Sequence, residues 1–435
     1  MENRENVSEE GLVRGIRRWD LVGVVINSVI GAGIFVLPAR AFKLIDSYSL
    51  IAFVICAFVV VLIILCFAEV SSRFTETGGP YLYARTAFGP AVGFQVGWMN
   101  WLARISAYAT NCNLLVVYLS FFWPAGGSGL RRAAVITGLT LVLTVINYLG
   151  VRDAAVTSNV FIVAKLLPLI LFIAAGLFFL TPENFTLGAA PSYGSFSTAV
   201  LLLVYAFTGF ENATVPTGEI VNPRRNLPLA ILIAIAIVTV IYISIQAVSI
   251  GTLPNLGGTE RPLADAAAMF LGPIGASIIA AGAIVSIIGN LNVNLLTSPR
   301  IPFAMSSRGE LPKILSAIHS KFRTPHVAII VSGILMLALT LSSSLIYALT
   351  VSTIARLLAY AATCVALPTL RRKKDAPPAQ FTVPGGPVIS VIAVLLSIWL
   401  LSNSTYLEAR DSAIVIAIGI AIYFSYRYVA ARKTA

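Results

Sequence analysis

Long apolar runs recur along the whole chain, and they restrict its possible folds more than any other feature. A helix that crosses about 30 Å of hydrocarbon needs about 20 mostly apolar residues. The sequence therefore predicts an all-α polytopic membrane protein with twelve transmembrane helices in a lipid bilayer. The twelve runs lie at about residues 20–37, 48–72, 91–122, 131–150, 156–179, 196–220, 228–251, 272–297, 326–343, 345–369, 386–403 and 411–430.

The composition agrees with a membrane protein and disfavours other classes. Of the 435 residues, 58% are apolar and 11% are charged, with a net charge of +12, whereas an average soluble domain is about 25% charged. A soluble enzyme and a secreted disulfide scaffold are therefore poor interpretations. The basic residues are scattered through short loops rather than gathered in one patch, so no nucleic-acid partner is expected.

The distribution of Lys and Arg predicts the orientation. The tails (1–19 and 431–435) and the loops on the N-terminal side carry 21 of these residues, the opposite loops carry 6, and three lie inside the runs. Basic loops stay in the cytoplasm, and an even number of spans returns the chain to the side where it started. We therefore expect an integral protein of the plasma membrane with both termini cytoplasmic.

Two of the runs have glycine and polar residues at their middle rather than at their ends. The first contains Gly31-Ala32-Gly33, and the sixth contains Gly209-Phe210-Glu211-Asn212. A charge at mid-membrane costs about 2.5–3.5 kcal/mol, and irregular backbone at that depth must line protein or water. We therefore expect helices 1 and 6 to be discontinuous. For the first run, a small-residue face between two packed helices is the alternative.

Paired interruptions at matching positions of two halves point to a central substrate site. The amides before a half-helix that begins near Ile34 present partial positive charge to a carboxylate. The last carbonyls of the first half of the sixth run present partial negative charge to an ammonium. This pair of sites suits a zwitterion such as an α-amino acid. The candidate substrate-binding residues are Ile30, Gly31, Ala32, Gly33, Ala206, Phe207, Thr208, Gly209 and Phe210.

Several motifs follow one another in a characteristic order. They are Val29-Ile30-Gly31-Ala32-Gly33-Ile34-Phe35, Gly78-Gly79-Pro80-Tyr81-Leu82-Tyr83, Gly209-Phe210-Glu211 followed by Glu219-Ile220-Val221-Asn222-Pro223-Arg224, and Arg308-Gly309-Glu310-Leu311-Pro312. Over nearly the whole chain the sequence resembles amino acid permeases of the APC (amino acid–polyamine–organocation) superfamily. It departs from their first-span pattern at Ala32, where many members have serine.

This resemblance implies a LeuT-type fold and alternating access to a site between spans one, three, six, eight and ten. The first five spans (20–179) and the next five (196–369) would form an inverted repeat. Two extra helices (386–430) would lie outside it.

Lys165 lies about ten residues into the fifth run, whereas a snorkelling lysine belongs near the end of a span. The resemblance to proton-coupled permeases implies that its ammonium faces the broken part of helix 1. There it would take the place of the cation that sodium-coupled members bind. A fixed structural cation and a snorkelling lysine are the alternatives.

Glu211 is the second candidate for proton coupling. It either receives a proton during the cycle or shapes the charge of the pocket, and the alternative is a fixed ion pair with Arg104 or Lys165. Arg104 and Arg356 are possible pathway or structural charges. The charged residues deep in the predicted spans are Arg104, Lys165, Arg356 and Glu211, which give three positive charges and one negative charge. This balance argues against cationic substrates.

Asn290 and Asn294 lie four residues apart in the eighth run and so share a helix face. They either line the pathway or make hydrogen bonds between helices. The four cysteines and the two histidines show no metal-ligand spacing, so neither a metal nor a cofactor is expected.

No constellation of a nucleophile and an acid–base pair appears, so an enzyme is not expected. A channel, a six-plus-six transporter and a non-transporting nutrient receptor are the other classes. The sequence favours a secondary active transporter of an amino acid, with proton symport ahead of substrate–product exchange. The identity of the amino acid and the oligomeric state stay open.

Overall fold

The computed structural model describes residues 16–31, 33–149, 154–215, 217–322 and 324–434, and nearly all of them are helical. Within these residues the one extended pairing is a single bridge between Ile16 and Ile220. The α-helices are α1 (Arg18–Val29), α2 (Leu37–Ile45), α3 (Ser49–Ser71), α4 (Pro80–Phe88), α5 (Pro90–Phe122), α6 (Gly129–Leu149), α7 (Ala154–Gly176), α8 (Tyr193–Phe207), α9 (Pro223–Thr252), α10 (Pro262–Thr297), α11 (Arg300–Ser307), α12 (His326–Ser342), α13 (Leu345–Arg372), α14 (Gly386–Leu401) and α15 (Tyr406–Thr434).

Proline and glycine mark several of the helix boundaries. The helices α4, α5, α9 and α10 each begin at a proline, which lacks the amide hydrogen that the first helical residue would leave unpaired. Inside α10, Gly272 has φ 65° and ψ −165° and divides the helix at a kink before Pro273. The predicted eighth span, 272–297, is therefore the second part of α10.

Eight helices among the described residues are long and apolar enough to cross a membrane. The number is nine if the pair Gly386–Leu401 and Tyr406–Tyr428, bent by 118°, is one span. Every predicted run contains helix, but α1 has 12 residues and α12 has 17. The helix α1 is shorter than a full span, and α12 is at the lower limit of the usual length. The fold is therefore that of a polytopic membrane protein, and the number twelve stays a prediction.

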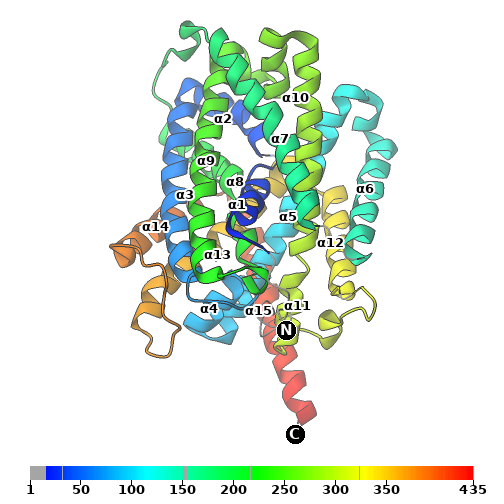
Figure 1. The fold of residues 1–435 in the computed structure, drawn as a ribbon, viewed down its shortest axis with the longest axis vertical. Coiled ribbons are helices and arrows are strands. Elements are labelled where there is room, and N and C mark those ends of the chain that lie inside the picture. Colours follow the sequence, from blue (N-terminus) through cyan, green and yellow to red (C-terminus); the bar gives the residue numbers. More distant parts are fainter. Residues whose placement is uncertain (1–15, 32, 150–153, 216, 323, 435) are drawn as a thin grey trace, which may run out of the picture.

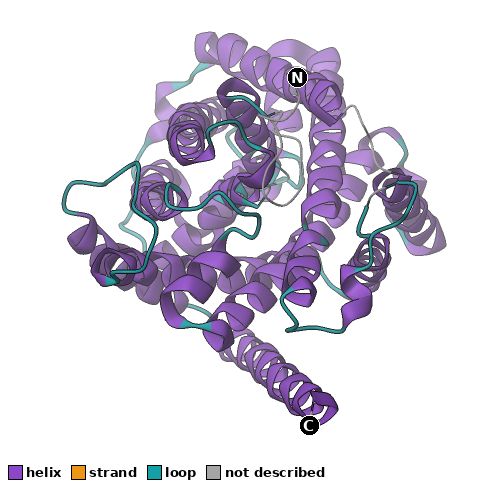
Figure 2. Ribbon diagram, turned by 60° about the horizontal axis from the view of Figure 1, so that its bottom comes forward, coloured by secondary structure: helices purple, strands orange, loops and turns teal. Residues whose placement is uncertain are grey.

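The helix α1 lies at the centre of the bundle, with α3, α5, α8, α9 and α13 around it (Figure 1). It packs against α9, α7 and α10, while α5 packs against α13, α4 and α10. The loops join helix ends. The C-terminal end of α15 projects from the molecule (Figure 2), while an earlier part of this helix packs against α5 and α13.

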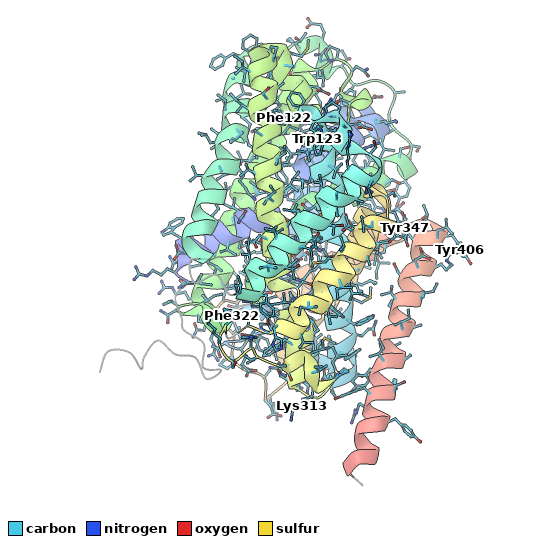
Figure 3. All side chains as sticks on the ribbon, turned by 90° about the vertical axis from the view of Figure 1, so that its right-hand side faces the viewer. Phe122, Trp123, Lys313, Phe322, Tyr347 and Tyr406 are labelled. Atoms are coloured by element: carbon cyan, nitrogen blue, oxygen red, sulfur yellow. The ribbon has the colours of Figure 1, made fainter. Side chains whose placement is uncertain are left out.

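Apolar side chains are exposed on the outside of the bundle, where a soluble protein would carry charges. On α6, for example, Leu141, Val142 and Val145 are each more than half exposed. In Figure 3 the aromatic residues Phe122 and Trp123 lie toward the opposite end of the molecule from Lys313. Aromatic and basic residues are typical of the two edges of a membrane-spanning region.

Candidate functional site

The first helix stops inside the protein. The helix α1 ends at Val29, and a 3-10 turn, η1 (Gly33–Phe35), leads into α2. The Gly31 amide donates to Val29 O at 2.8 Å, which is the contact of a γ-turn. The second half-helix, expected near Ile34, therefore starts as one 3-10 turn and becomes α-helical at Leu37. Ala32 lies outside the described residues.

Side chains satisfy the backbone carbonyls at this break. A helix C-terminus leaves its last carbonyls without partners in the helix itself, and here three neighbouring helices supply the donors. The bonds run from Lys165 Nζ to Asn27 O (2.9 Å) and Ile30 O (2.7 Å), from Asn290 Nδ2 to Ser28 O (2.9 Å), and from Tyr242 OH to Val29 O (3.0 Å). Hydrogen bonds from α7, α9 and α10 thus stabilise the irregular backbone at the break.

Lys165 is completely buried against this break. Its ammonium lies at the carbonyl end of α1, where the helix dipole favours a positive charge. The lysine faces the interruption of the first helix, as the resemblance implied, and it does not snorkel to the surface. Its role in coupling stays a prediction.

The sixth span is interrupted between α8 and the 3-10 helix η6 (Phe210–Thr214). Thr208 is extended, and Gly209 has φ +114°, a value that glycine adopts at little cost. Ala206 O lies 3.0 Å from the hydroxyl of Tyr242, the group that also contacts Val29 O. One tyrosine on α9 thus links the carbonyl ends of both broken helices.

The two breaks touch each other through their glycines. A Cβ atom on Gly209 would lie 2.4 Å from Ser28 O, and one on Gly33 would lie 3.0 Å from the Cα atom of Ala206. From the sequence, Gly33 is predicted to bind a carboxylate, and Gly209 is a candidate substrate-binding residue at the other break. In the structure the two irregular segments approach each other closely because glycine has no side chain.

Glu211 is completely buried at the sixth-span break. Its Oε2 accepts hydrogen bonds from the Gly209 amide (2.9 Å) and the Tyr360 hydroxyl (2.6 Å). Its Oε1 lies 3.5 Å from Nε of Arg356. An ion pair with Arg104 or Lys165 was the expected alternative for Glu211. The pair forms instead with Arg356, because α13 carries this cation against the break.

Arg104 joins three elements below the same break. Its Nη1 donates to Thr297 Oγ1 at 2.7 Å and also to Asn212 Oδ1, while its Nε donates to Asn100 Oδ1 at 3.3 Å. The guanidinium thereby connects α5 to η6 and to the end of α10. These contacts give Arg104 a structural environment within the described part of the chain.

A polar cavity lies between the two breaks. The volume open to the centre of a water molecule is about 20 Å³, room for about one water. An amino acid therefore enters only if the walls separate. Most of the lining is polar, and among the described residues no Leu, Ile, Met, Phe or Trp takes part in it. The lining residues are Ser28, Val29, Gly31, Gly33, Ala107, Asn111, Tyr205, Thr208, Asn212, Asn290, Asn294 and Arg356.

The candidate residues thus fall into two groups. Gly31, Gly33, Thr208, Asn290, Asn294 and Arg356 line the cavity. Ile30, Ala206, Phe207, Gly209 and Phe210 are at the breaks but do not line it. Phe207 packs edge-on against Tyr242, and Phe210 packs edge-on against Phe67, with ring centroids 5.1 Å apart in each case.

The asparagines of α10 line the cavity and also make hydrogen bonds between helices. Asn294 Nδ2 donates to Asn290 Oδ1 at 2.7 Å, and both residues line the cavity. Asn292, on another face, accepts a hydrogen bond from Asn147 of α6 at 3.0 Å. The first two therefore face the cavity, and Asn292 connects two helices.

Sequence reasoning missed the tyrosines and one asparagine of this region. Tyr242 joins the breaks, Tyr360 bonds Glu211, and Asn111 donates to the hydroxyl of Tyr205 at 3.2 Å. Each places a polar group inside a predicted span, and a buried tyrosine hydroxyl usually has a hydrogen-bond partner. A polar group inside a predicted span was therefore visible in the sequence, but many other tyrosines of the chain show the same pattern.

Comparisons with known proteins agree with this geometry. A family model described as "Amino acid permease" matches residues 16–424. The branched-chain amino acid permease BcaP of Bacillus subtilis (strain 168) is 27% identical over 96% of this chain and 94% of its own length. The serine/threonine exchanger SteT of the same organism is 30% identical over 96% and 97%. The human large neutral amino acids transporter small subunit 2 is 29% identical over 92% and 78%.

The membrane-spanning helices and these matches define an integral membrane transport protein rather than an enzyme. The chain belongs to the amino acid permease family. The three relatives named above are amino acid transporters, and the family match confirms the resemblance that the motifs indicated.

Proposed function

We propose that the chain is a secondary active transporter that carries a small, polar α-amino acid by alternating access. The observation that carries this proposal is the contact of two broken helices beside a polar, buried cavity. Transport of amino acids follows from the family, and the substrate class and the mechanism are the parts proposed.

The polarity of the cavity supports a small hydrophilic substrate. Its walls present amide, hydroxyl and guanidinium groups, and Ser28 Oγ and Asn294 Oδ1 are buried without a hydrogen-bond partner in the described structure. An apolar side chain placed there would leave such groups unpaired, at a cost of about 1–3 kcal/mol for each. A hydroxyl or amide side chain would satisfy them. The relative SteT is named as a serine/threonine exchanger.

The substrate's charged ends would use the two breaks. Its carboxylate would bind near Gly31 and Gly33, before the turn that leads into α2. Its ammonium would bind near the carbonyl end of α8, where Thr208 lines the cavity. In this proposal the twelve spans form two inverted halves, 20–179 and 196–369, with 386–430 outside them. Both termini are cytoplasmic, and the protein lies in the plasma membrane.

Proton symport is the coupling that we propose. Lys165 is buried and contacts the carbonyls of Asn27 and Ile30, so a change in its charge would act directly on the first break. Substrate exchange is the second candidate, because SteT is named as an exchanger and is 30% identical to this chain.

The test is uptake by purified protein in sealed vesicles, with a panel of labelled amino acids and with or without an imposed pH gradient. We expect serine, threonine or a similarly small polar amino acid to be taken up faster than leucine or phenylalanine. Uptake that requires an acidic outside supports symport, and acceleration by unlabelled substrate inside supports exchange. Preference for large apolar amino acids would contradict the proposed substrate class.

A further inference from the structure

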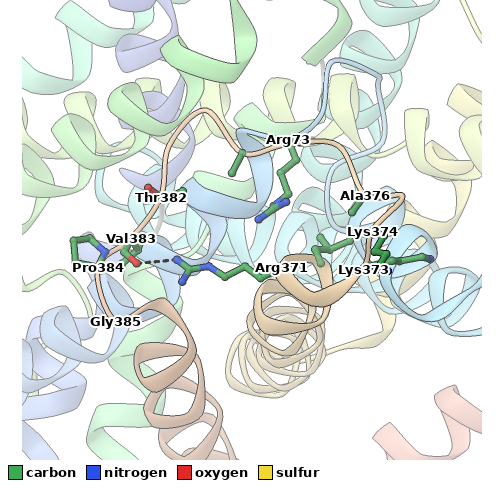
Figure 4. A pocket seen from close by; sticks show the side chains of 11 residues that line it. Arg73, Arg371, Lys373, Lys374, Ala376, Thr382, Val383, Pro384 and Gly385 are labelled. Carbon is green, nitrogen blue, oxygen red and sulfur yellow. Dashed lines mark hydrogen bonds between the residues drawn. The ribbon is translucent and has the colours of Figure 1, made fainter.

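A basic pocket lies where the chain passes from α13 to α14, far in sequence from the two breaks. Its cavity volume is about 710 Å³, and it opens to the surface. Four cationic side chains, Arg73, Arg371, Lys373 and Lys374, line it together with the backbone of Val383 to Gly385 (Figure 4).

One buried carboxylate pairs with two of the cations that line this pocket. Glu69 at the end of α3 is completely buried and accepts two hydrogen bonds of 2.6 Å from the guanidinium of Arg371. It also accepts the Val383 amide at 2.8 Å, and Arg73 lies 3.5 Å away. This network fixes the 373–385 loop to α3 and gives the pocket a defined shape.

The positive charge of the pocket exceeds what this carboxylate neutralises. Four cations line the pocket, and Glu69, which contacts Arg371 and Arg73 but is not part of the lining, supplies one negative charge. Arg73 is 6% exposed, and its Nε is buried without a hydrogen-bond partner in the described structure. Lys373 and Lys374 are exposed at the rim. An anion with several acceptor oxygens, such as a phosphate group, matches this arrangement.

The helix that leaves the pocket has an apolar face that the described residues leave exposed. Gly385 lines the pocket and directly precedes α14. From there an exposed stripe follows helical spacing, with Val388, Val391, Ile392, Leu395 and Ile398 each 40% to 63% exposed. An acyl chain that begins at the pocket can lie along this stripe.

We propose that this pocket binds the phosphate-bearing headgroup of an anionic phospholipid, with the lipid's acyl chains along α14. Basic pockets at the edge of the membrane recognise such headgroups through charge. The apolar stripe selects a lipid over a free phosphate ion, because only a lipid supplies both parts. The bound lipid would hold the 373–385 loop against α3 at the membrane surface.

The test is native mass spectrometry of the full-length protein in detergent with phosphatidylglycerol or with phosphatidylcholine of the same acyl chains. We expect the protein to retain phosphatidylglycerol preferentially. The variant Lys373→Gln/Lys374→Gln should weaken this retention by about 30-fold, from the loss of two cations near the headgroup. Both lysines are exposed, so the variant should fold.

The control is Lys313→Gln/Lys321→Gln, which removes two exposed lysines from another loop. It should leave lipid retention unchanged. A second variant, Val391→Ser/Leu395→Ser, should reduce lipid retention. In this variant inorganic phosphate should compete for the basic pocket as it does in the unchanged protein. Three results would overturn the proposal. They are equal retention of phosphatidylglycerol and phosphatidylcholine, an equal loss of lipid retention in the control variant, and displacement of bound phosphatidylglycerol by inorganic phosphate as effectively as by added phosphatidylglycerol.

Discussion

Gly209 lies so close to Ser28 that a methyl group on the glycine would meet the serine carbonyl oxygen at 2.4 Å. This contact joins the break of the sixth span to that of the first. Gly209 also has φ +114°, so steric exclusion and backbone conformation both require glycine there. The close approach of the two breaks therefore requires a residue without a Cβ atom at position 209.

Replacing Gly209 with alanine should therefore abolish transport. The added Cβ atom must push the two breaks apart, and the positive φ adds about 1–2 kcal/mol of strain. The measurement is the initial rate of amino acid uptake together with the thermal unfolding temperature. Gly138→Ala is the matched control, since a Cβ atom there meets nothing within 4 Å and the site is on the exposed face of α6. Full uptake by Gly209→Ala would show that the breaks tolerate separation.

Replacing Lys165 with methionine should uncouple uptake from a pH gradient. The variant keeps a long side chain but loses the charge beside Asn27 O and Ile30 O. We expect concentrative, pH-driven uptake to disappear. Lys43→Met, at an exposed position of α2, should keep it. Retention of full uphill uptake in Lys165→Met would assign the lysine a structural role instead.

Removing the hydroxyl of Tyr242 should destabilise the arrangement of the breaks. Tyr242→Phe leaves Ala206 O without this donor, while Val29 O keeps the hydrogen bond from the Gly31 amide. An unsatisfied buried polar group costs about 1–3 kcal/mol. A lower unfolding temperature and a slower uptake rate are expected. Tyr48→Phe removes a weaker, exposed bond of 3.4 Å to Gly188 O and should change stability by less than about 0.5 kcal/mol. Equal effects of the two variants would contradict this interpretation.

The Glu211–Arg356 pair should show strong coupling in a double-mutant cycle. Removing one partner of a buried ion pair costs about 3–5 kcal/mol, because the other charge is left uncompensated. Glu211→Gln and Arg356→Gln should each lower the unfolding temperature markedly. The double variant should lose less stability than the sum of the two. Additive losses would mean that the residues act independently, despite the 3.5 Å between their charged atoms.

The sequence located both breaks correctly but not the direction of the aromatic side chains beside them. Glycine and charge inside an apolar run indicate irregular backbone, since hydrocarbon does not tolerate either without compensation. Phe207 and Phe210 were adjacent to the break in sequence and were assigned to the substrate. In this structure they pack against Tyr242 and Phe67, because a change of backbone direction at Thr208 and Gly209 decides which way each ring points. Their contact with a substrate stays a prediction.

The partner of Glu211 shows the same limit. Sequence alone identified one buried carboxylate and three buried cations, and electrostatics required a pairing among them. The choice of Arg356 over Arg104 depends on how α13 and α5 pack around η6, which involves residues more than a hundred positions apart.

By itself the sequence determined that the chain is an α-helical membrane protein, where its apolar helices lie, and which two of them are interrupted. These features are local, because bilayer thickness, charge and glycine act on each segment separately. Only the tertiary structure decided that the breaks meet, that Tyr242 and Lys165 complete the carbonyl ends, and that the enclosed cavity is polar. Those features arise from the packing of distant helices, which no single segment specifies.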